Sequence, residues 1–221
     1  MNESANCPNC GTKIKSGIFG SNELLSAEKC ALISEMNSTP KTTGCEKCSG
    51  AIYNNAIAAF RKKREEMLAK IQQHIHHIPI VTAQNPYGWE YKTLSIVTGQ
   101  STTGTGVFAE ISSSWTDFFG MQSNAYNRKI AHGESLCAQQ VRQKAIQVGG
   151  NAIIAADIDY TELGAEKGMI MVAMSGTAIK LTNLDVLDKY KVDSINEISE
   201  MSEQLYKWAN QYPAVIKDLE K

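Results

Sequence analysis

The sequence predicts an α+β fold, because hydrophobic residues follow a helical spacing in some segments and an extended pattern in others. Helical spacing runs through residues 51–77 and again through residues 195–212. Between them lie β-rich runs at residues 91–98 and 169–181, separated by glycine-containing turns. With a cysteine-rich beginning, these patterns predict four consecutive parts. The expected boundaries are residues 1–50, 51–78, 79–181 and 182–221.

The composition of the 221 residues excludes several classes of protein. A hydrophobic fraction of 43% is too high for a disordered chain. The formal net charge of -1 argues against a strongly basic nucleic-acid or membrane-surface protein. The start of the sequence has no signal-peptide pattern, and no apolar run approaches the roughly 20 residues that span a bilayer. We therefore expect a cytoplasmic protein without a membrane span.

Four cysteines predict a metal site near the start of the chain. Cys7 and Cys10 form one Cys-x-x-Cys pair, and Cys45 and Cys48 form another. In a reducing cytoplasm, two such pairs favour a tetrahedral Zn²⁺ site over structural disulfides. A glycine follows each pair closely, as a tight metal-binding turn requires. We expect a zinc-ribbon-like module in which the ion is structural, because four thiolates leave no open position for catalysis.

Three other residues are weaker candidates for metal ligands. Cys30 lies in an apolar, helical segment, where a thiol usually packs as a small hydrophobic side chain but remains a candidate metal ligand. His74 and His77 are three residues apart, so one helix face could present both to a metal ion. The competing interpretation is that they are polar residues at the C-terminus of a helix, where the helix dipole favours positive charge.

Two long helices are expected to flank the central part. Residues 51–77 contain neither proline nor glycine, and we expect their amphipathic helix to connect the cysteine module to the centre and to end before Pro79. Its basic run, residues 61–64, lacks interleaved aromatic residues, so nucleic-acid binding is not expected. In the tail, Ser194 and Glu197 have the spacing of a capping box that would begin a helix. The apolar face of that helix would pack within the assembly or bind a separate protein.

The central part should contain strands at residues 80–82 and 91–98, a helix over residues 124–148, and strands at residues 151–160 and 169–181. Several short sequences here resemble the YbjQ-like family, described as heavy-metal-binding domains. They include Val97-Thr98-Gly99, Gly150-Asn151-Ala152-Ile153-Ile154, Asp157-Ile158-Asp159-Tyr160 and Ser175-Gly176-Thr177-Ala178-Ile179-Lys180. The resemblance covers about residues 80–181. It implies a dodecin-like β-β-α-β-β subunit that self-associates into a ring-shaped homopentamer.

The central part offers few residues for chemistry. Asp157 and Asp159 are two apart on an expected strand, so their carboxylates should share one face. Such a pair can bind a cation, or it can simply face solvent or a neighbouring subunit. No set of residues resembles a catalytic triad. The sequence therefore favours a non-enzymatic, oligomeric, metal-binding scaffold or binding protein. The alternative is a sensor or enzyme that holds a small ligand or heavy metal between subunits.

Overall fold

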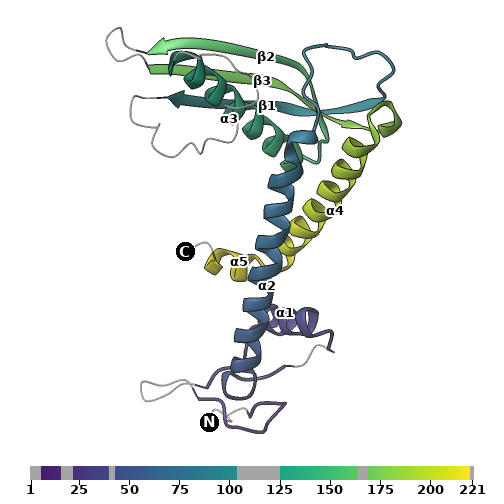
Figure 1. Cartoon of the computed structure of the whole chain (residues 1–221). Coiled ribbons are helices and arrows are strands. Elements are labelled where there is room, and N and C mark those ends of the chain that lie inside the picture. Colours follow the sequence, from purple (N-terminus) through teal and green to yellow (C-terminus); the bar gives the residue numbers. More distant parts are fainter. Residues whose placement is uncertain (1–5, 16–21, 40–42, 104–124, 164–168, 220–221) are drawn as a thin grey trace. The chain divides into compact units, whose positions relative to one another are not determined.

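The computed structural model describes residues 6–15, 22–39, 43–103, 125–163 and 169–219 (Figure 1). The chain forms two compact units. Unit 1 comprises residues 1–70 and 203–221, and unit 2 comprises residues 71–202. None of the described helices is both long and apolar enough to cross a membrane. In chain order the elements are α1 (Ala27–Asn37), α2 (Glu46–His74), η1 (Ile75–His77), β1 (Tyr91–Thr103), α3 (Ala125–Gln147), β2 (Ala152–Leu163), β3 (Met169–Leu181), η3 (Leu184–Val186), α4 (Lys189–Gln211) and α5 (Pro213–Leu219).

Unit 2 is built on an antiparallel sheet with the strand order β1-β3-β2. β3 lies in the centre and pairs with β1 from Tyr91↔Leu181 to Thr103↔Ile170. It pairs with β2 from Ala152↔Ile179 to Leu163↔Met169. The ladder between β2 and β3 is interrupted at Ala155, whose φ of 50° lies in the left-handed region. The predicted α+β class is confirmed.

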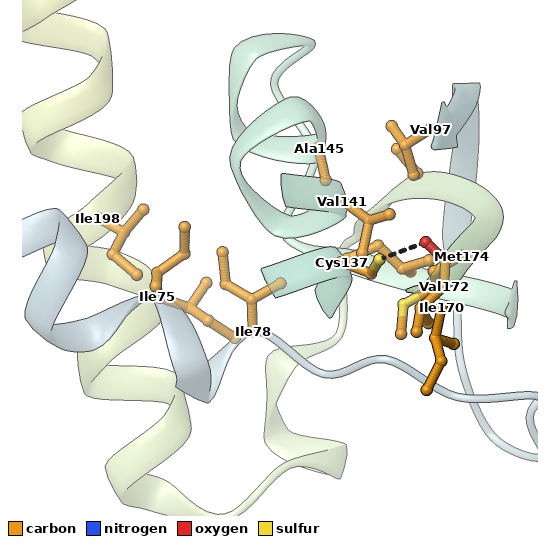
Figure 2. Packing of buried hydrophobic residues seen from close by; sticks show 13 residues of the cluster. Ile75, Ile78, Val97, Cys137, Val141, Ala145, Ile170, Val172, Met174 and Ile198 are labelled. Carbon is orange, nitrogen blue, oxygen red and sulfur yellow. Dashed lines mark hydrogen bonds between the residues drawn. The ribbon is translucent and has the colours of Figure 1, made fainter. Parts of the chain in front are cut away.

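Helix α3 covers one face of this sheet and forms the main core with it (Figure 2). Cys137, Val141 and Ala145 of α3 are buried against Val97 of β1 and Val172 of β3. The thiol of Cys137 donates a hydrogen bond to the carbonyl oxygen of Val172 at 3.2 Å. Cys137 is therefore a packing residue, as its apolar surroundings in the sequence predict. Further buried members of the core are Ile75, Ile78, Ile153, Ile170, Met174, Ala178, Ile195 and Ile198.

The first strand predicted for the centre, residues 80–82, is only a single parallel bridge between Ile80 and Ile153. Two hydrogen bonds make this bridge, from Val81 N–H to the Ile153 carbonyl and from Ile153 N–H to the Pro79 carbonyl, both at 2.9 Å. Pro79 has no N–H to extend the ladder. The amides of Ala155 and Ala156 donate hydrogen bonds to the carbonyls of Ala83 and Val81 at 3.1 and 3.0 Å, but the bulge at Ala155 breaks the regular ladder pattern. The described residues thus form a β-α-β-β order, and the expected fourth strand is reduced to an edge contact.

Unit 1 combines the beginning of the chain with its end. Leu32 of α1, Phe60 of α2 and Trp208 of α4 are buried together, with the Phe60 and Trp208 ring centroids 4.7 Å apart. Glu35 of α1 accepts hydrogen bonds from Trp208 Nε1–H at 2.7 Å and from the hydroxyl of Tyr212. The cluster also contains buried Val215 of α5. The tail helix therefore packs on its own chain in unit 1.

Both long helices begin earlier than the sequence predicts. Helix α2 starts at Glu46, inside the second cysteine pair. Helix α4 starts at Lys189, so Ser194 is not its N-cap. Instead, the Ser194 hydroxyl donates a hydrogen bond to the carbonyl of Tyr190, four residues earlier, at 2.9 Å. This bond within a helical turn is the usual alternative to capping for a serine inside a helix.

Helix α3 approaches β1 so closely that Gly99 has no room for a side chain. A Cβ atom there would lie 2.6 Å from the carbonyl oxygen of Cys137. We predict that Gly99→Ala lowers the free energy of unfolding of unit 2 by about 1–3 kcal/mol, because the helix must move off the sheet. Urea unfolding followed by circular dichroism would measure the loss. Gly50→Ala is the control, since no atom lies within 4 Å of the added methyl group and alanine favours a helix. An equal shift for both variants would contradict the prediction.

Candidate metal centre

Four cysteine sulfur atoms lie together near the start of α2. The Sγ atoms of Cys7, Cys10, Cys45 and Cys48 are all within 4.8 Å of one another. Three of the separations, Cys7–Cys48, Cys10–Cys45 and Cys45–Cys48, are 3.8 Å. Among the described residues, this is the one group of three or more potential metal ligands that is already assembled. The structure thus brings together the four cysteines that the spacing of the sequence singles out.

The first pair lies on a tight turn closed by backbone hydrogen bonds. Cys7 N–H donates to the Thr12 carbonyl, and Gly11 N–H donates to the Cys7 carbonyl, both at 2.8 Å. Gly11 has a φ of 70°, a left-handed conformation that glycine adopts without steric cost. The expected role of the glycine after this pair is therefore confirmed. The turn leaves both sulfur atoms on the side that faces the second pair.

The second pair has a different local structure, because it forms the first turn of α2. Cys45 immediately precedes the helix, and its carbonyl accepts hydrogen bonds from Cys48 N–H at 3.2 Å and Ser49 N–H at 2.9 Å. Gly50 lies within the helix and does not have a positive φ, so the expectation of a second glycine turn is wrong. A helical turn brings residues three apart onto one face, which already places both thiols together. The positive end of the helix dipole also favours thiolates at this position.

The chain preceding Cys45 fixes where α2 begins. Leu24 and Cys45 form an antiparallel bridge, with hydrogen bonds from Leu25 N–H to Gly44 O at 2.8 Å and from Glu46 N–H to Glu23 O at 2.9 Å. The side chain of Asn22 accepts a hydrogen bond from Lys47 N–H at 3.2 Å. These bonds satisfy amide groups that a helix start otherwise leaves without partners.

Close packing around the second pair demands a small residue at position 44. A Cβ atom on Gly44 would lie 2.0 Å from Ser49 Oγ and 3.4 Å from Cys48 Sγ. This requirement and the role of Asn22 were missed by sequence reasoning. Glycine directly before a cysteine pair is a local signal, but the contact that requires it is made only in the folded helix. Asn22 lies 25 residues from its partner, so no short motif announces it.

The local hydrogen bonds favour the thiolate form of two cysteines. The hydrogen bond between Cys48 Sγ and Ser49 Oγ, at 3.3 Å, is the largest influence and lowers the pKa of Cys48 to about 6. A backbone hydrogen bond from Cys10 is the main cause that lowers the pKa of Cys7. Cys7 and Cys45 are buried, Cys48 is half-buried and Cys10 is exposed. A metal ion needs deprotonated thiols, and these neighbours reduce the cost of deprotonating Cys7 and Cys48, whereas desolvation and the thiols of Cys7 and Cys48 raise the pKa of Cys10.

The geometry fits a tetrahedral metal ion bound by sulfur. A tetrahedron with metal–sulfur bonds of about 2.3 Å has edges of about 3.8 Å. The three separations of 3.8 Å match that edge. Disulfides require sulfur atoms about 2.05 Å apart, so the four thiols are free. Cys30 stands outside the group: it is buried in α1, with its Sγ 3.8 Å from the Leu25 carbonyl.

The other candidate ligands lie in unit 2. His74 Nε2 is 3.7 Å from a carboxylate oxygen of Glu197, and the His74 and His77 ring centroids are 6.2 Å apart. Burial is the main cause that lowers the pKa of His77. Asp157 and Asp159 are both exposed on β2, where they pair with Ser175 and Ala173 of β3. None of these residues belongs to an assembled group of three ligands in the described chain.

Comparisons with known proteins concern unit 2. A family model described as "Putative heavy-metal-binding" matches residues 78–182. A UPF0145 protein of Clostridium botulinum is 37% identical over 90 residues, which are 41% of this chain and 83% of that protein. UPF0145 proteins of Listeria grayi and Listeria monocytogenes are 40% identical over 90 residues and 38% identical over 96 residues. Those matches cover 41% and 43% of this chain and 83% and 86% of the relatives.

One solved structure, a Pediococcus pentosaceus protein of unknown function from the DUF74 family, aligns with 47% of this chain and 96% of its own. Its sequence identity is 17% and its TM-score is 0.32. The family match begins after all four clustered cysteines, so it does not include the metal centre described above. The sequence matches in unit 2 show that the chain belongs to the YbjQ-like UPF0145 family.

Proposed function

We propose that this chain is a non-enzymatic, oligomeric binding protein whose N-terminal module is held together by one structural zinc ion. The observation that carries the proposal is the four-sulfur group, with its separations of 3.8 Å. Tetrahedral sulfur coordination is typical of zinc or iron–sulfur sites. Zinc is favoured because two Cys-x-x-Cys pairs are the usual ligand set of a structural zinc module.

A structural role follows from the number of ligands. Four thiolates complete the tetrahedron and leave no position for water or substrate. Among the described residues before Leu32 of α1, Leu25 and Cys30 are the buried apolar side chains outside the sulfur group. Small modules of this kind take much of their folding free energy from the metal. We therefore assign the ion to stability and the binding function to unit 2.

The sheet of unit 2 offers a surface for self-association. The face opposite α3 carries a small apolar cluster near Ile179 and Leu181, and among the described residues away from this cluster Asp157, Asp159 and Ser175 are exposed. Ile96 of β1 is 78% exposed on this face, where it pairs with Thr177 of the central strand. Single exposed apolar side chains are common on protein surfaces, so the support for an interface comes from the family resemblance rather than from Ile96 alone. We propose that this face is buried in a homopentamer, as the family resemblance implies. We also propose that the protein is cytoplasmic.

A second candidate function places a ligand between subunits of that assembly. Asp157 and Asp159 lie on the same sheet face, away from the apolar cluster, and both are exposed. Two carboxylates on one face attract a cation or a basic ligand, and a neighbouring subunit would complete the site. The chain would then act as a heavy-metal or small-ligand sensor, or as an enzyme. A separate protein partner for the tail is also proposed, because Tyr206 of α4 is exposed.

The zinc proposal predicts a clear difference between cysteine variants. Elemental mass spectrometry of the purified protein should find about one zinc ion per chain. Cys7→Ser and Cys45→Ser should lose the ion and expose the N-terminal module to limited proteolysis, while unit 2 stays folded. Cys30→Ala is the matched control, since Cys30 is buried but lies outside the group, and it should retain zinc. Zinc-free wild-type protein, or protease-resistant Cys7→Ser protein, would contradict the proposal.

The assembly proposal predicts that Ile96→Asp converts the oligomer into smaller species. A charge on the buried interface would have to be desolvated without a partner, which is costly. Native mass spectrometry of wild type and variant would give the subunit number directly. Ile52→Asp, at an exposed apolar position in unit 1, should leave the assembly intact. A strictly monomeric wild type would refute the proposal.

The ligand-site alternative is tested with a double Asp157→Ala/Asp159→Ala variant. If the carboxylate pair binds a cation, the variant should bind at least one metal ion fewer per chain than wild type. Isothermal titration with Zn²⁺, Ni²⁺ and Cd²⁺ on protein that already holds its cysteine-bound ion would show the loss. Native mass spectrometry should confirm that the variant still assembles. Unchanged stoichiometry for all three ions would exclude this alternative.

A further inference from the structure

His74 and Glu197 form a contact in unit 2 that the cysteine site does not explain. His74 is the last residue of α2, and Glu197 lies in α4. The imidazole Nε2 is 3.7 Å from a carboxylate oxygen of Glu197. Both side chains remain partly accessible, with 29% of the histidine and 58% of the glutamate side chain exposed. An ion from solvent can therefore reach the space between them.

Hydrogen bonds on the opposite side of the ring determine which nitrogen of His74 carries the proton. The Ser194 hydroxyl donates its hydrogen to the Tyr190 carbonyl at 2.9 Å. A hydroxyl has only one hydrogen to donate, so its oxygen is left to accept from His74 Nδ1, 3.4 Å away. Nδ1 therefore carries the hydrogen, and in the neutral ring the lone pair is on Nε2.

This arrangement aims two electron pairs at each other. In this neutral form the Nε2 lone pair and the Glu197 carboxylate are both acceptors, and at 3.7 Å they repel unless a proton or a metal ion lies between them. Histidines that bind metals usually show this pattern, with one nitrogen on the ion and the other held by a hydrogen bond from the ring. The Ser194–Tyr190 pair supplies that orienting bond here.

A third ligand is available from the turn that follows α2. The ring centroid of His77 lies 6.2 Å from that of His74, and His77 packs edge-on against Tyr190 at 5.3 Å. To bind the same ion, His77 would have to rotate away from His76, whose ring centroid lies 3.8 Å from its own. Two cationic side chains act on His77: Lys191 forms an ion pair with Asp188 at 2.9 Å, and Arg142 donates a hydrogen bond to the Ile78 carbonyl at 2.8 Å.

We propose that His74, Glu197 and His77 form a second metal site, specific for a divalent transition-metal ion with affinity for imidazole. Two imidazoles and one carboxylate favour Zn²⁺, Ni²⁺ or Cu²⁺ over Mg²⁺ and Ca²⁺, which prefer oxygen ligands alone. Three protein ligands leave a position for water or a further ligand, in contrast to the closed cysteine site. The ion would join the end of α2 to the first turns of α4 within unit 2.

In the test, the full chain with zinc already in its cysteine site is titrated with Ni²⁺, and binding is measured by isothermal titration calorimetry. Wild type should bind one additional Ni²⁺ ion per chain. Glu197→Gln keeps the shape of the side chain but removes its charge, and it should weaken binding by more than about tenfold. Ser194→Ala removes the orienting bond and should weaken it by about 10- to 100-fold. His132→Ala is the control, because His132 lies in α3 and is the remaining histidine outside this segment.

Replacing the metals with Co²⁺ separates the two sites by spectroscopy. Cobalt bound by cysteine shows thiolate charge-transfer absorption, whereas cobalt bound by histidine and carboxylate does not. Absence of the one additional Ni²⁺ equivalent would mean that His74 and Glu197 form only a proton-mediated ion pair, and it would overturn the proposal. Glu197→Gln binding with wild-type affinity would mean a simple histidine chelate, and it would overturn the proposal as well. Neither result would affect the zinc content of the cysteine site, which is measured on the same samples.

Discussion

Four sulfur atoms confined within 4.8 Å of one another are the constraint on which unit 1 depends. They connect a turn near residue 10 to the start of α2, and the bridge between Leu24 and Cys45 places α1 directly beside this junction. Helix α1 then supplies Leu32 and Glu35, which contact the end of α4. Each contact relies on the one before it. If the sulfur cluster were lost, α1 would lose this restraint and the packing around Trp208 would weaken, although the cysteines and Trp208 are far apart in sequence.

Local patterns predict those elements whose residues act through near neighbours. The helical spacing before Pro79 identifies α2, and the apolar runs identify β2 and β3, because period and composition are local properties. The capping-box pattern at Ser194 fails for a physical reason. The Ser194 hydroxyl donates to a carbonyl one turn earlier, so it does not cap a helix. Ser194 lies inside a helix that already begins at Lys189. The strand expected at residues 80–82 likewise depends on β2, whose bulge at Ala155 no pattern within the sequence announces.

The same distinction applies to the metal centre. Cysteine spacing identifies all four sulfur atoms because two-residue spacing nearly guarantees that each pair converges. It does not reveal that one pair sits on a glycine turn and the other on a helix, since both structures satisfy the same spacing. The contact of Gly44 with Ser49 and the bond from Lys47 N–H to Asn22 arise only after the chain folds. Glu35 is similar, because its partner Trp208 is 173 residues away.

The location of the family match changes how its description should be understood. Residues 78–182 lie within unit 2, whereas the sulfur cluster lies in unit 1. Ninety matched residues already make up 83% of the Clostridium botulinum relative, so the shared domain accounts for most of that protein. Any property common to such relatives must reside in unit 2, and the cysteines cannot be its source. Metal binding by this chain therefore raises two separate questions. One concerns the group of four sulfur atoms in unit 1, and the other concerns oxygen and nitrogen ligands on or beside the shared domain.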